Sequence, residues 1–172
     1  PGDRVMALLS YGGMQEEVVI GANRCLPMPG SMDFETAAVF SLTYGTSYHA
    51  LVDRGRVQPG ETVLILGASG GVGTAAVDIA SRLGAEVIAA AGSDEKLSLL
   101  VDFFGVQKTI NYRTEGLVLR DQVKPITSGR GADVIYDPIG GDAFQQSFRC
   151  INWNGRILVV GFAADGENLP KA

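Results

Sequence analysis

The sequence contains little of what several protein classes require. Only two of its 172 residues are cysteine and one is histidine. Cys25 and Cys150 lie far apart without metal-type spacing, so we expect small buried side chains and neither a disulfide framework nor a zinc cluster. No apolar run approaches the roughly 18 residues of a membrane span, and no signal peptide opens the chain. We therefore expect a cytoplasmic protein that does not associate with membranes.

Basic segments are also missing. The formal net charge is −5, and no block of Lys and Arg alternates with aromatic residues, so nucleic acid is not expected as a partner. Hydrophobic residues make up 46% of the chain and charged residues 19%, which is typical of a globular fold. The chain opens at Pro1 without Met. We take this as a sign that it is a piece of a longer protein.

The first 33 residues favour β-structure. Short strands are predicted at residues 4–9, 16–20 and 23–26, too few to close a sheet, so this segment is interpreted as part of another β-rich domain. Asp33 is a suitable N-cap for a helix. A second helix is expected after Gly45, ending at Gly55.

From residue 62 onward, strand and helix patterns alternate. Strands are predicted at 62–67, 86–91, 108–111, 133–137 and 156–161, and helices at 71–83, 94–104, 115–126 and 142–150. The strands are apolar on both faces, as buried parallel strands are, and the connections are short and marked by glycine. This pattern predicts an α/β fold with a doubly wound parallel sheet.

The first of these turns, Ala68-Ser69-Gly70-Gly71-Val72-Gly73, carries the main functional signal. It follows a strand and opens a helix, where free N–H groups and the helix dipole attract an anion. It also fits the dinucleotide fingerprint with Ala as the first residue. Residues 67–71 match the G-x-S-x-G elbow of hydrolases as well, but the only histidine, His49, precedes Ser69, which is the wrong order for that triad. We expect His49 to lie on a helix surface or half-buried.

The end of the second strand bears on the choice of cofactor. An NAD site usually places Asp or Glu there, whereas this chain has Gly92, Ser93 and, one turn later, Lys96. A 2′-phosphate would suit these residues, which favours NADP. Ser93 as a simple N-cap beside a solvated Lys96 is the alternative, and Asp94 and Glu95 weaken the NADP interpretation. Tyr112 is either a surface residue or an adenosine contact, and Asp137 is equally a helix cap or a cofactor contact.

The order of motifs along the chain resembles one family. The segments that carry the resemblance are residues 43–51, 59–64, the glycine turn, 91–96, 110–112, 137–141 and 155–162. Together they are similar to the zinc-independent quinone oxidoreductases, including zeta-crystallin, of the medium-chain dehydrogenase/reductase superfamily. The resemblance covers essentially the whole chain.

This resemblance implies a domain plan. Residues 1–33 would end a GroES-like catalytic domain, and residues 34–172 would form most of a Rossmann domain whose last strand follows Ala172. The full-length protein is expected to be a homodimer. Zinc-dependent relatives carry a metal-binding Cys just before the position of Tyr44, where this chain has Ala37-Ala38-Val39-Phe40, so no metal is expected.

The resemblance also implies a set of cofactor-binding residues. Thr46 would lie near the nicotinamide, and Gly161 and Phe162 would contact its carboxamide. The remaining expected contacts are Ala68, Ser69, Gly70, Gly71 and Val72 for the pyrophosphate, Gly73 for close helix packing, and Gly92, Ser93, Lys96 and Tyr112 for the adenosine 2′-phosphate.

The expected activity is NADPH-dependent hydride transfer to a small molecule, a quinone or a related α,β-unsaturated carbonyl. An enoyl- or acryloyl-thioester reductase is the alternative enzyme. A non-catalytic dinucleotide-binding module of the crystallin type is the alternative outside enzymes. No residue is assigned as a proton donor, and the catalytic residues stay unassigned.

Overall fold

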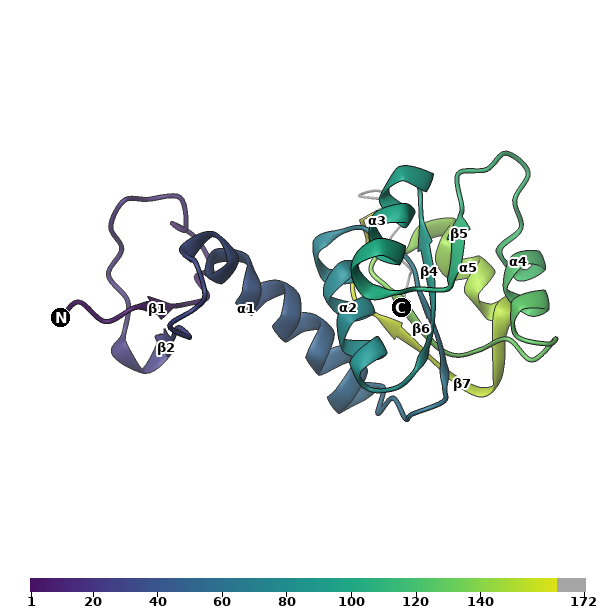
Figure 1. Cartoon of the computed structure of the whole chain (residues 1–172), viewed down its shortest axis with the longest axis horizontal. Helices are drawn as coiled ribbons and strands as arrows, with labels where there is room; N and C mark the ends of the chain where they lie inside the picture. Colours follow the sequence, from purple (N-terminus) through teal and green to yellow (C-terminus); the bar gives the residue numbers. More distant parts are fainter. Residues whose placement is uncertain (164–172) are drawn as a thin grey trace.

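The computed structural model describes residues 1–163, which form an α/β domain, a long helix and an N-terminal segment at the far end of that helix (Figure 1). The N-terminal segment contacts the rest of the protein mainly through this helix, α1. The α/β domain holds both hydrophobic clusters and therefore carries the fold.

Among residues 1–163, one parallel sheet of five strands lies at the centre of the α/β domain. The strands are β3 (Thr62–Ile65), β4 (Glu86–Ala91), β5 (Lys108–Asn111), β6 (Ala132–Asp137) and β7 (Ile151–Val159). Their spatial order is β5-β4-β3-β6-β7, so the direction of winding reverses between β3 and β6. The helices that connect them are α2 (Gly71–Arg82), α3 (Asp94–Phe104), α4 (Leu119–Ile126) and α5 (Gly141–Cys150). This doubly wound, Rossmann-type arrangement confirms the predicted fold class.

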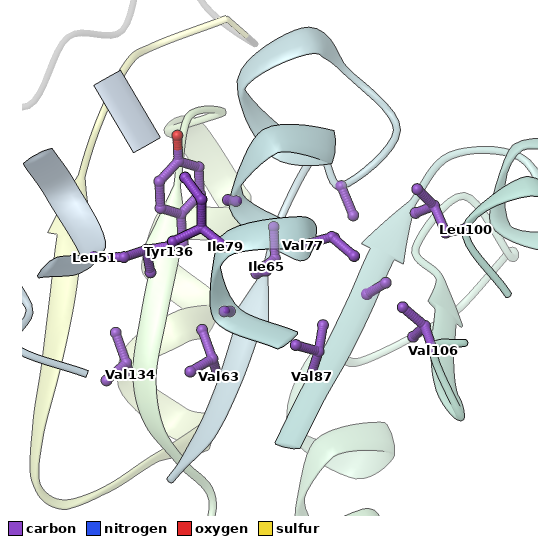
Figure 2. Close-up of a cluster of buried hydrophobic side chains, with 14 of the residues drawn as sticks. Leu51, Val63, Ile65, Val77, Ile79, Val87, Leu100, Val106, Val134 and Tyr136 are labelled. Atoms are coloured by element: carbon purple, nitrogen blue, oxygen red, sulfur yellow. The ribbon is translucent and has the colours of Figure 1, made fainter. Parts of the chain in front are cut away.

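Both faces of the sheet are buried, as the apolar strands predicted. In β3, Val63 and Ile65 join the cluster under α2 and α3, whereas Leu64 joins the cluster under α4 and α5. Figure 2 shows the first cluster, in which side chains of β3, β4 and β6 pack against Val77 of α2 and Leu100 of α3. Alternate side chains of β3 therefore pack against helices on the two opposite faces of the sheet. Because the strands are parallel, the turns that follow them all lie at the carboxyl end of the strands.

The region before the sheet is one continuous helix, not the two predicted. Helix α1 spans Phe34–Tyr48 and leads directly into a π-helical turn, η2 (His49–Arg54). Asp33 caps α1 by accepting a hydrogen bond from the N–H of Thr36 at 2.6 Å, as expected. Gly45 costs a helix about 1 kcal/mol relative to Ala. The neighbouring side chains bond to α2, and these tertiary contacts override the break that Gly45 suggested.

The N-terminal segment has less β-structure than predicted. Only β1 (Val5–Met6) and β2 (Leu26–Pro27) pair, in antiparallel fashion, and a 3₁₀ turn, η1 (Ala22–Arg24), replaces the first half of the third predicted strand. The predicted strand at 16–20 is wrong: Val18 and Val19 are exposed and no strand lies beside them. Strand-forming residues without a partner strand do not form a ladder, which explains the difference.

The last strand is longer than the predicted 156–161 because it begins with a bulge. Ala132 of β6 pairs with Ile151, and Val134 pairs with Arg156. Residues 152–155 of β7 therefore lie opposite the single residue Asp133 of β6. The end of the predicted second domain, residues 164–172, lies outside the described residues. Within the described part of the chain, no helix has both the length and the apolar character to cross a bilayer.

Candidate functional site

The glycine turn follows β3 at the point where the winding of the sheet reverses. Gly70 is the N-cap of α2, and its carbonyl accepts from the N–H of Thr74 at 2.8 Å. Among residues 1–163, the N–H groups of Gly71, Val72 and Gly73 have no hydrogen-bond acceptor. Gly70 and Gly71 are exposed. Three such donors at a helix N-terminus that opens to solvent could bind an anion, and the crevice at the reversal point is where such sheets bind ligands.

The packing of Gly73 explains why this position is glycine. A Cβ there would lie 2.1 Å from the carbonyl oxygen of Gly67 and 2.8 Å from the Cα of Ala68. These are backbone atoms that no rotamer change can move. The absence of a side chain therefore lets α2 approach the end of β3 closely, as the dinucleotide fingerprint requires.

Two further turns meet the glycine turn at this edge. A Cβ on Gly67 would lie 3.3 Å from side-chain atoms of Pro138 and Ile139, in the turn after β6. Gly140 of that turn lies against Phe162, whose Cδ1 would be 3.1 Å from a Cβ. The ends of β3, β6 and β7 therefore form one contiguous surface, on which Gly161 and Phe162 lie beside the Pro138 turn.

Asp137 ends β6 and holds this turn together. Its Oδ1 accepts hydrogen bonds from the N–H groups of Ile139 and Gly140 at 2.8 and 2.9 Å. The side chain is fully buried, and Oδ2 has no partner among residues 1–163. Asp137 does not cap α5, whose N-cap is Gly140 without a side-chain bond, but it orders the turn that leads into this helix.

A buried hydroxyl network fixes α1 against the glycine turn. The Ser47 hydroxyl donates to the carbonyl of Val72 at 2.7 Å and lies 2.8 Å from the Tyr136 hydroxyl of β6. Tyr44, one turn earlier, donates to Asp78 of α2 at 3.1 Å. Burial raises the pKa of Tyr136, so its hydroxyl stays protonated and can donate to Ser47. Sequence reasoning missed Ser47, although its spacing from Tyr44 and Leu51 places all three on one helix face.

The residues at the end of β4 show how the adenosine side is built. Ser93 caps α3 by accepting from the N–H of Lys96 at 3.4 Å, and Lys96 is exposed. The N–H of Tyr112 donates to the carbonyl of Ala91 at 3.1 Å, which places the end of β5 beside Gly92. Tyr112 is half-buried against the second hydrophobic cluster, and burial raises the pKa of its phenol. The structure thus brings Gly92, Ser93, Lys96 and Tyr112 into one neighbourhood.

Lys96 and Ser69 also share a pocket of about 460 Å³ between α2 and α3, whose floor is apolar. The lysine therefore lies on the side of the site that faces the glycine turn. Ser69 is half-buried there, and its hydroxyl forms no hydrogen bond among residues 1–163.

Arg113 is a residue of this neighbourhood that sequence reasoning missed. Its side chain crosses Gly92, so that a Cβ on that glycine would lie 2.9 Å from Nε. The available signal was its place directly after β5, because the carboxyl ends of adjacent parallel strands lie side by side. The sequence alone did not reveal that β5 is the neighbour of β4.

Thr46 lies on the other side of the glycine turn. It is half-buried in a pocket of about 650 Å³ between the end of α1 and strand β7, and Val160, next to Gly161, lines the same pocket. The structure therefore places the predicted nicotinamide residues toward β7 and the predicted adenosine residues toward β4. A dinucleotide whose pyrophosphate lies on the central turn would need this division.

The remaining candidates have structural explanations. His49 is exposed, as expected, and its Nδ1 lies 2.9 Å from Asp53. Cys150 is fully buried and burial raises its thiol pKa to about 11, which suits an inert core residue, whereas Cys25 is only half-buried. Within residues 1–163, no cluster of three or more His, Cys, Asp or Glu side chains could hold a metal ion.

Comparisons with known proteins point in one direction. The model of the zinc-binding dehydrogenase family matches residues 71–172, more than half of the chain. A quinone oxidoreductase-like protein 2 homolog of Nematostella vectensis is 43% identical over 165 residues, which cover 95% of this chain and 44% of that protein.

Two solved structures have a similar fold. The quinone oxidoreductase of Thermus thermophilus, described together with its complex with NADPH, superimposes with a TM-score of 0.83 at 32% identity, covering 98% of this chain and 53% of that one. The CurK enoyl reductase has a TM-score of 0.74 at 36% identity, with coverages of 80% and 40%. The chain therefore spans about half the length of the relatives it matches.

The family match, the reversal of a parallel sheet at a glycine turn and the close Gly73 contact agree with one another. The chain belongs to the zinc-binding dehydrogenase family, in the quinone oxidoreductase-like branch of the medium-chain dehydrogenase/reductase superfamily.

Proposed function

We propose that this chain is the cofactor-binding part of an NADPH-dependent oxidoreductase that reduces a quinone or a related α,β-unsaturated carbonyl. The observation that carries the proposal is the set of three N–H groups, on Gly71, Val72 and Gly73, that find no acceptor among residues 1–163 at the reversal point of the sheet. They suit the pyrophosphate of a dinucleotide. The similar quinone oxidoreductase of Thermus thermophilus, which is described with an NADPH complex, supports the choice of cofactor.

The residues would act by binding and orientation. The turn from Ala68 to Gly73 would hold the pyrophosphate, and Thr46, Gly161 and Phe162 would border the nicotinamide. The nicotinamide cofactor supplies the hydride, so the protein contributes position and polarity. Among residues 1–163 we assign no proton donor.

The preference for NADPH over NADH rests on the end of β4. Gly92 presents no carboxylate to the ribose, whereas an acid at this place is what an NAD site uses to bind the 2′-hydroxyl. Ser93 and Lys96 would border the 2′-phosphate, with Tyr112 beside them. The Ser93 side chain already caps α3, so its contribution to the phosphate would come from the neighbouring backbone.

A second candidate is an enoyl-thioester reductase, favoured by the similarity to the CurK enoyl reductase. A dinucleotide-binding module without catalysis is the third. For the full-length protein we propose, as expectations from the resemblance, a GroES-like domain that begins before residue 1 and includes residues 1–33, a homodimer, catalysis without zinc, and a cytoplasmic location.

Calorimetric titration of the chain with NADPH and NADH tests the cofactor assignment. We expect NADPH to bind about tenfold more tightly, and Lys96→Ala to narrow this ratio. Lys108→Ala is the matched control, because Lys108 pairs with Glu86 at the opposite end of the strands and should leave the ratio unchanged. Equal affinities of the unmodified chain for the two cofactors would contradict the NADPH assignment.

Turnover by the full-length protein separates the two enzymatic candidates. We expect reduction of 1,4-benzoquinone with NADPH to exceed reduction of crotonyl-CoA. The opposite order would favour the enoyl-thioester reductase, and absence of turnover with both would favour the binding module.

A further inference from the structure

We propose that Arg113 is a specificity-determining residue, which lies across Gly92 and binds the 2′-phosphate of the cofactor. This inference rests on the proposed function, because it names the residue that would make the site selective for a phosphorylated ribose.

The contact between Arg113 and Gly92 is the first argument. A Cβ on Gly92 would lie 2.9 Å from Nε, 3.1 Å from Cδ and 3.3 Å from Cγ of Arg113. Gly92 does not have a positive φ, so the backbone conformation does not demand glycine here. What the missing side chain provides is room for the arginine. The position where an NAD site carries its acid is thus occupied by a cation.

The backbone around Arg113 is held in place, which is the second argument. The N–H of Tyr112 bonds to the carbonyl of Ala91, and the N–H of Arg113 donates to Oδ1 of Asn111 at 3.1 Å. The amide Nδ2 of Asn111 donates in turn to Asp94 of α3 at 3.0 Å. These bonds tie the end of β5 to the end of β4 and to the start of α3, so the backbone of Arg113 is held beside Gly92.

The third argument is that the charge of Arg113 is not used within the described structure. Among residues 1–163, its guanidinium has no hydrogen-bond acceptor and no acidic partner. Arg156 shows the contrast, because its guanidinium bonds to both carboxylate oxygens of Glu61 and to the carbonyl of Gly55. Arg156 is a structural arginine, whereas Arg113 is positioned and keeps its planar set of donors available, which suits a phosphate.

Two acidic side chains lie nearby as well, and two cations match them in number. Asp94 and Glu95 begin α3, and the carboxylate of Asp94 is engaged by Asn111. Lys96 follows one position later, so a phosphate next to Gly92 would be bordered by the cations of Arg113 and Lys96. A 2′-phosphate carries about −1.5 to −2 charge, so each positioned cation should contribute measurably to binding.

A pair of nucleotides that lack the nicotinamide isolates this subsite. We would titrate the chain with 2′,5′-ADP and with 5′-AMP, which share the adenosine 5′-phosphate and differ only in the 2′-phosphate. Arg113→Ala should weaken 2′,5′-ADP at least about tenfold and change 5′-AMP less than about twofold. Arg113→Lys should recover part of the loss. Arg120→Ala, on the exposed side of α4, is the control and should affect neither nucleotide.

Gly92 supplies the more stringent test. Gly92→Ala should displace the arginine and weaken 2′,5′-ADP in the unmodified background, but should have little further effect when Arg113 is already Ala. An equal effect in both backgrounds would show that Gly92 acts independently of Arg113. That result, or an Arg113→Ala variant that keeps its preference for 2′,5′-ADP, would overturn the inference while leaving the proposed function intact.

The failure of the proposed function gives a different result. An unmodified chain that binds the two nucleotides equally, or binds neither, would overturn the NADPH assignment and with it the role of Arg113. Thermal unfolding of each variant checks that a loss of binding is not a loss of fold.

Discussion

Two glycines that follow neighbouring strands, Gly73 in the first turn of α2 and Gly92 directly after β4, lack a side chain for different reasons. At Gly73 the obstacle to a Cβ is main chain, the carbonyl oxygen of Gly67 at 2.1 Å. At Gly92 the obstacle is the movable side chain of Arg113, at 2.9 Å. A motif search treats both as glycines of a cofactor site. The structure separates a glycine required by the backbone from one that makes room for a neighbour.

This difference has an energetic meaning. Backbone atoms in a packed strand–helix contact cannot yield without shifting α2 away from the sheet, whereas an exposed arginine can rotate into solvent. Changing Gly73 should therefore affect folding, and changing Gly92 should affect only what binds.

Gly73→Ala should have the largest effect. The added methyl group would overlap the carbonyl of Gly67, so α2 must move and the core under it must loosen. We expect a loss of at least about 3 kcal/mol in the free energy of unfolding, measured by urea denaturation. Gly71→Ala is the matched control, since the nearest atom there is a methyl carbon of Thr43 at 3.1 Å and the residue is exposed. A Gly73→Ala variant as stable as Gly71→Ala would remove the contrast between the two glycines.

Ser47→Ala should have the second-largest effect on stability, because the Ser47 hydroxyl bonds to the carbonyl of Val72 in the glycine turn. The substitution leaves the buried Tyr136 hydroxyl without its partner, which should cost about 2 kcal/mol of unfolding free energy. Adding Tyr136→Phe should then cost little more, because the orphaned hydroxyl disappears. If the stability loss of the double variant instead equals the sum of the losses of the two single variants, the Ser47 and Tyr136 hydroxyls do not act as a pair.

A smaller effect is expected for the ion pair of Glu61 and Arg156, which is remote from both glycines. The hydrogen bonds from Arg156 hold the pKa of Glu61 below its usual 4.5. A lowered pKa stabilises the fold above pH 4.5 and loses that contribution as the pH falls through the folded-state value. Glu61→Gln should therefore cost about 1 kcal/mol at neutral pH.

The same comparison in acid tests the sign of this effect. Once Glu61 is protonated, it resembles Gln, so the stability difference between the two proteins should shrink in denaturation curves taken at progressively lower pH. A difference that stays constant from neutral to acid would mean that the charge of Glu61 contributes nothing.

Gly92→Ala should have the smallest effect on stability. Because only a flexible, exposed side chain must move, we expect a change below about 0.5 kcal/mol in thermal or urea unfolding. A loss as large as that of Gly73→Ala would show that Arg113 is packed rigidly, and the two glycines would then belong to one class.

Much of the α/β domain could be predicted because its signals are local. The apolar runs of β3 and β4, the cap at Asp33 and the glycine turn each indicate their structure within a few residues. The continuity of α1 through Gly45 could not be predicted, because it depends on contacts that Tyr44 and Ser47 make with α2. The N-terminal strands failed for the opposite reason, since strand-forming residues need a partner strand that their own sequence does not reveal.

The candidate site divides in the same way. The turn from Ala68 to Gly73 could be predicted, because its chemistry lies in consecutive backbone groups. Arg113 and the Ser47–Tyr136 pair could not, because each depends on which strands are neighbours. Pattern reasoning also could not say whether Asp137 faces a ligand or its own loop, since both uses require the same residue at the end of a strand.

Helix α1 has a mechanical consequence. Its bonds to α2 lie near its carboxyl end, at Tyr44 and Ser47, while Phe34 lies 13 positions before Ser47, about 20 Å away at 1.5 Å per residue. A tilt of about 5° around Ser47 would carry Phe34 through about 1.7 Å and Thr46 through only about 0.1 Å. Any such tilt would therefore move residues 1–33, at the far end of the helix, much more than Thr46, which lines the pocket beside β7 (Figure 1).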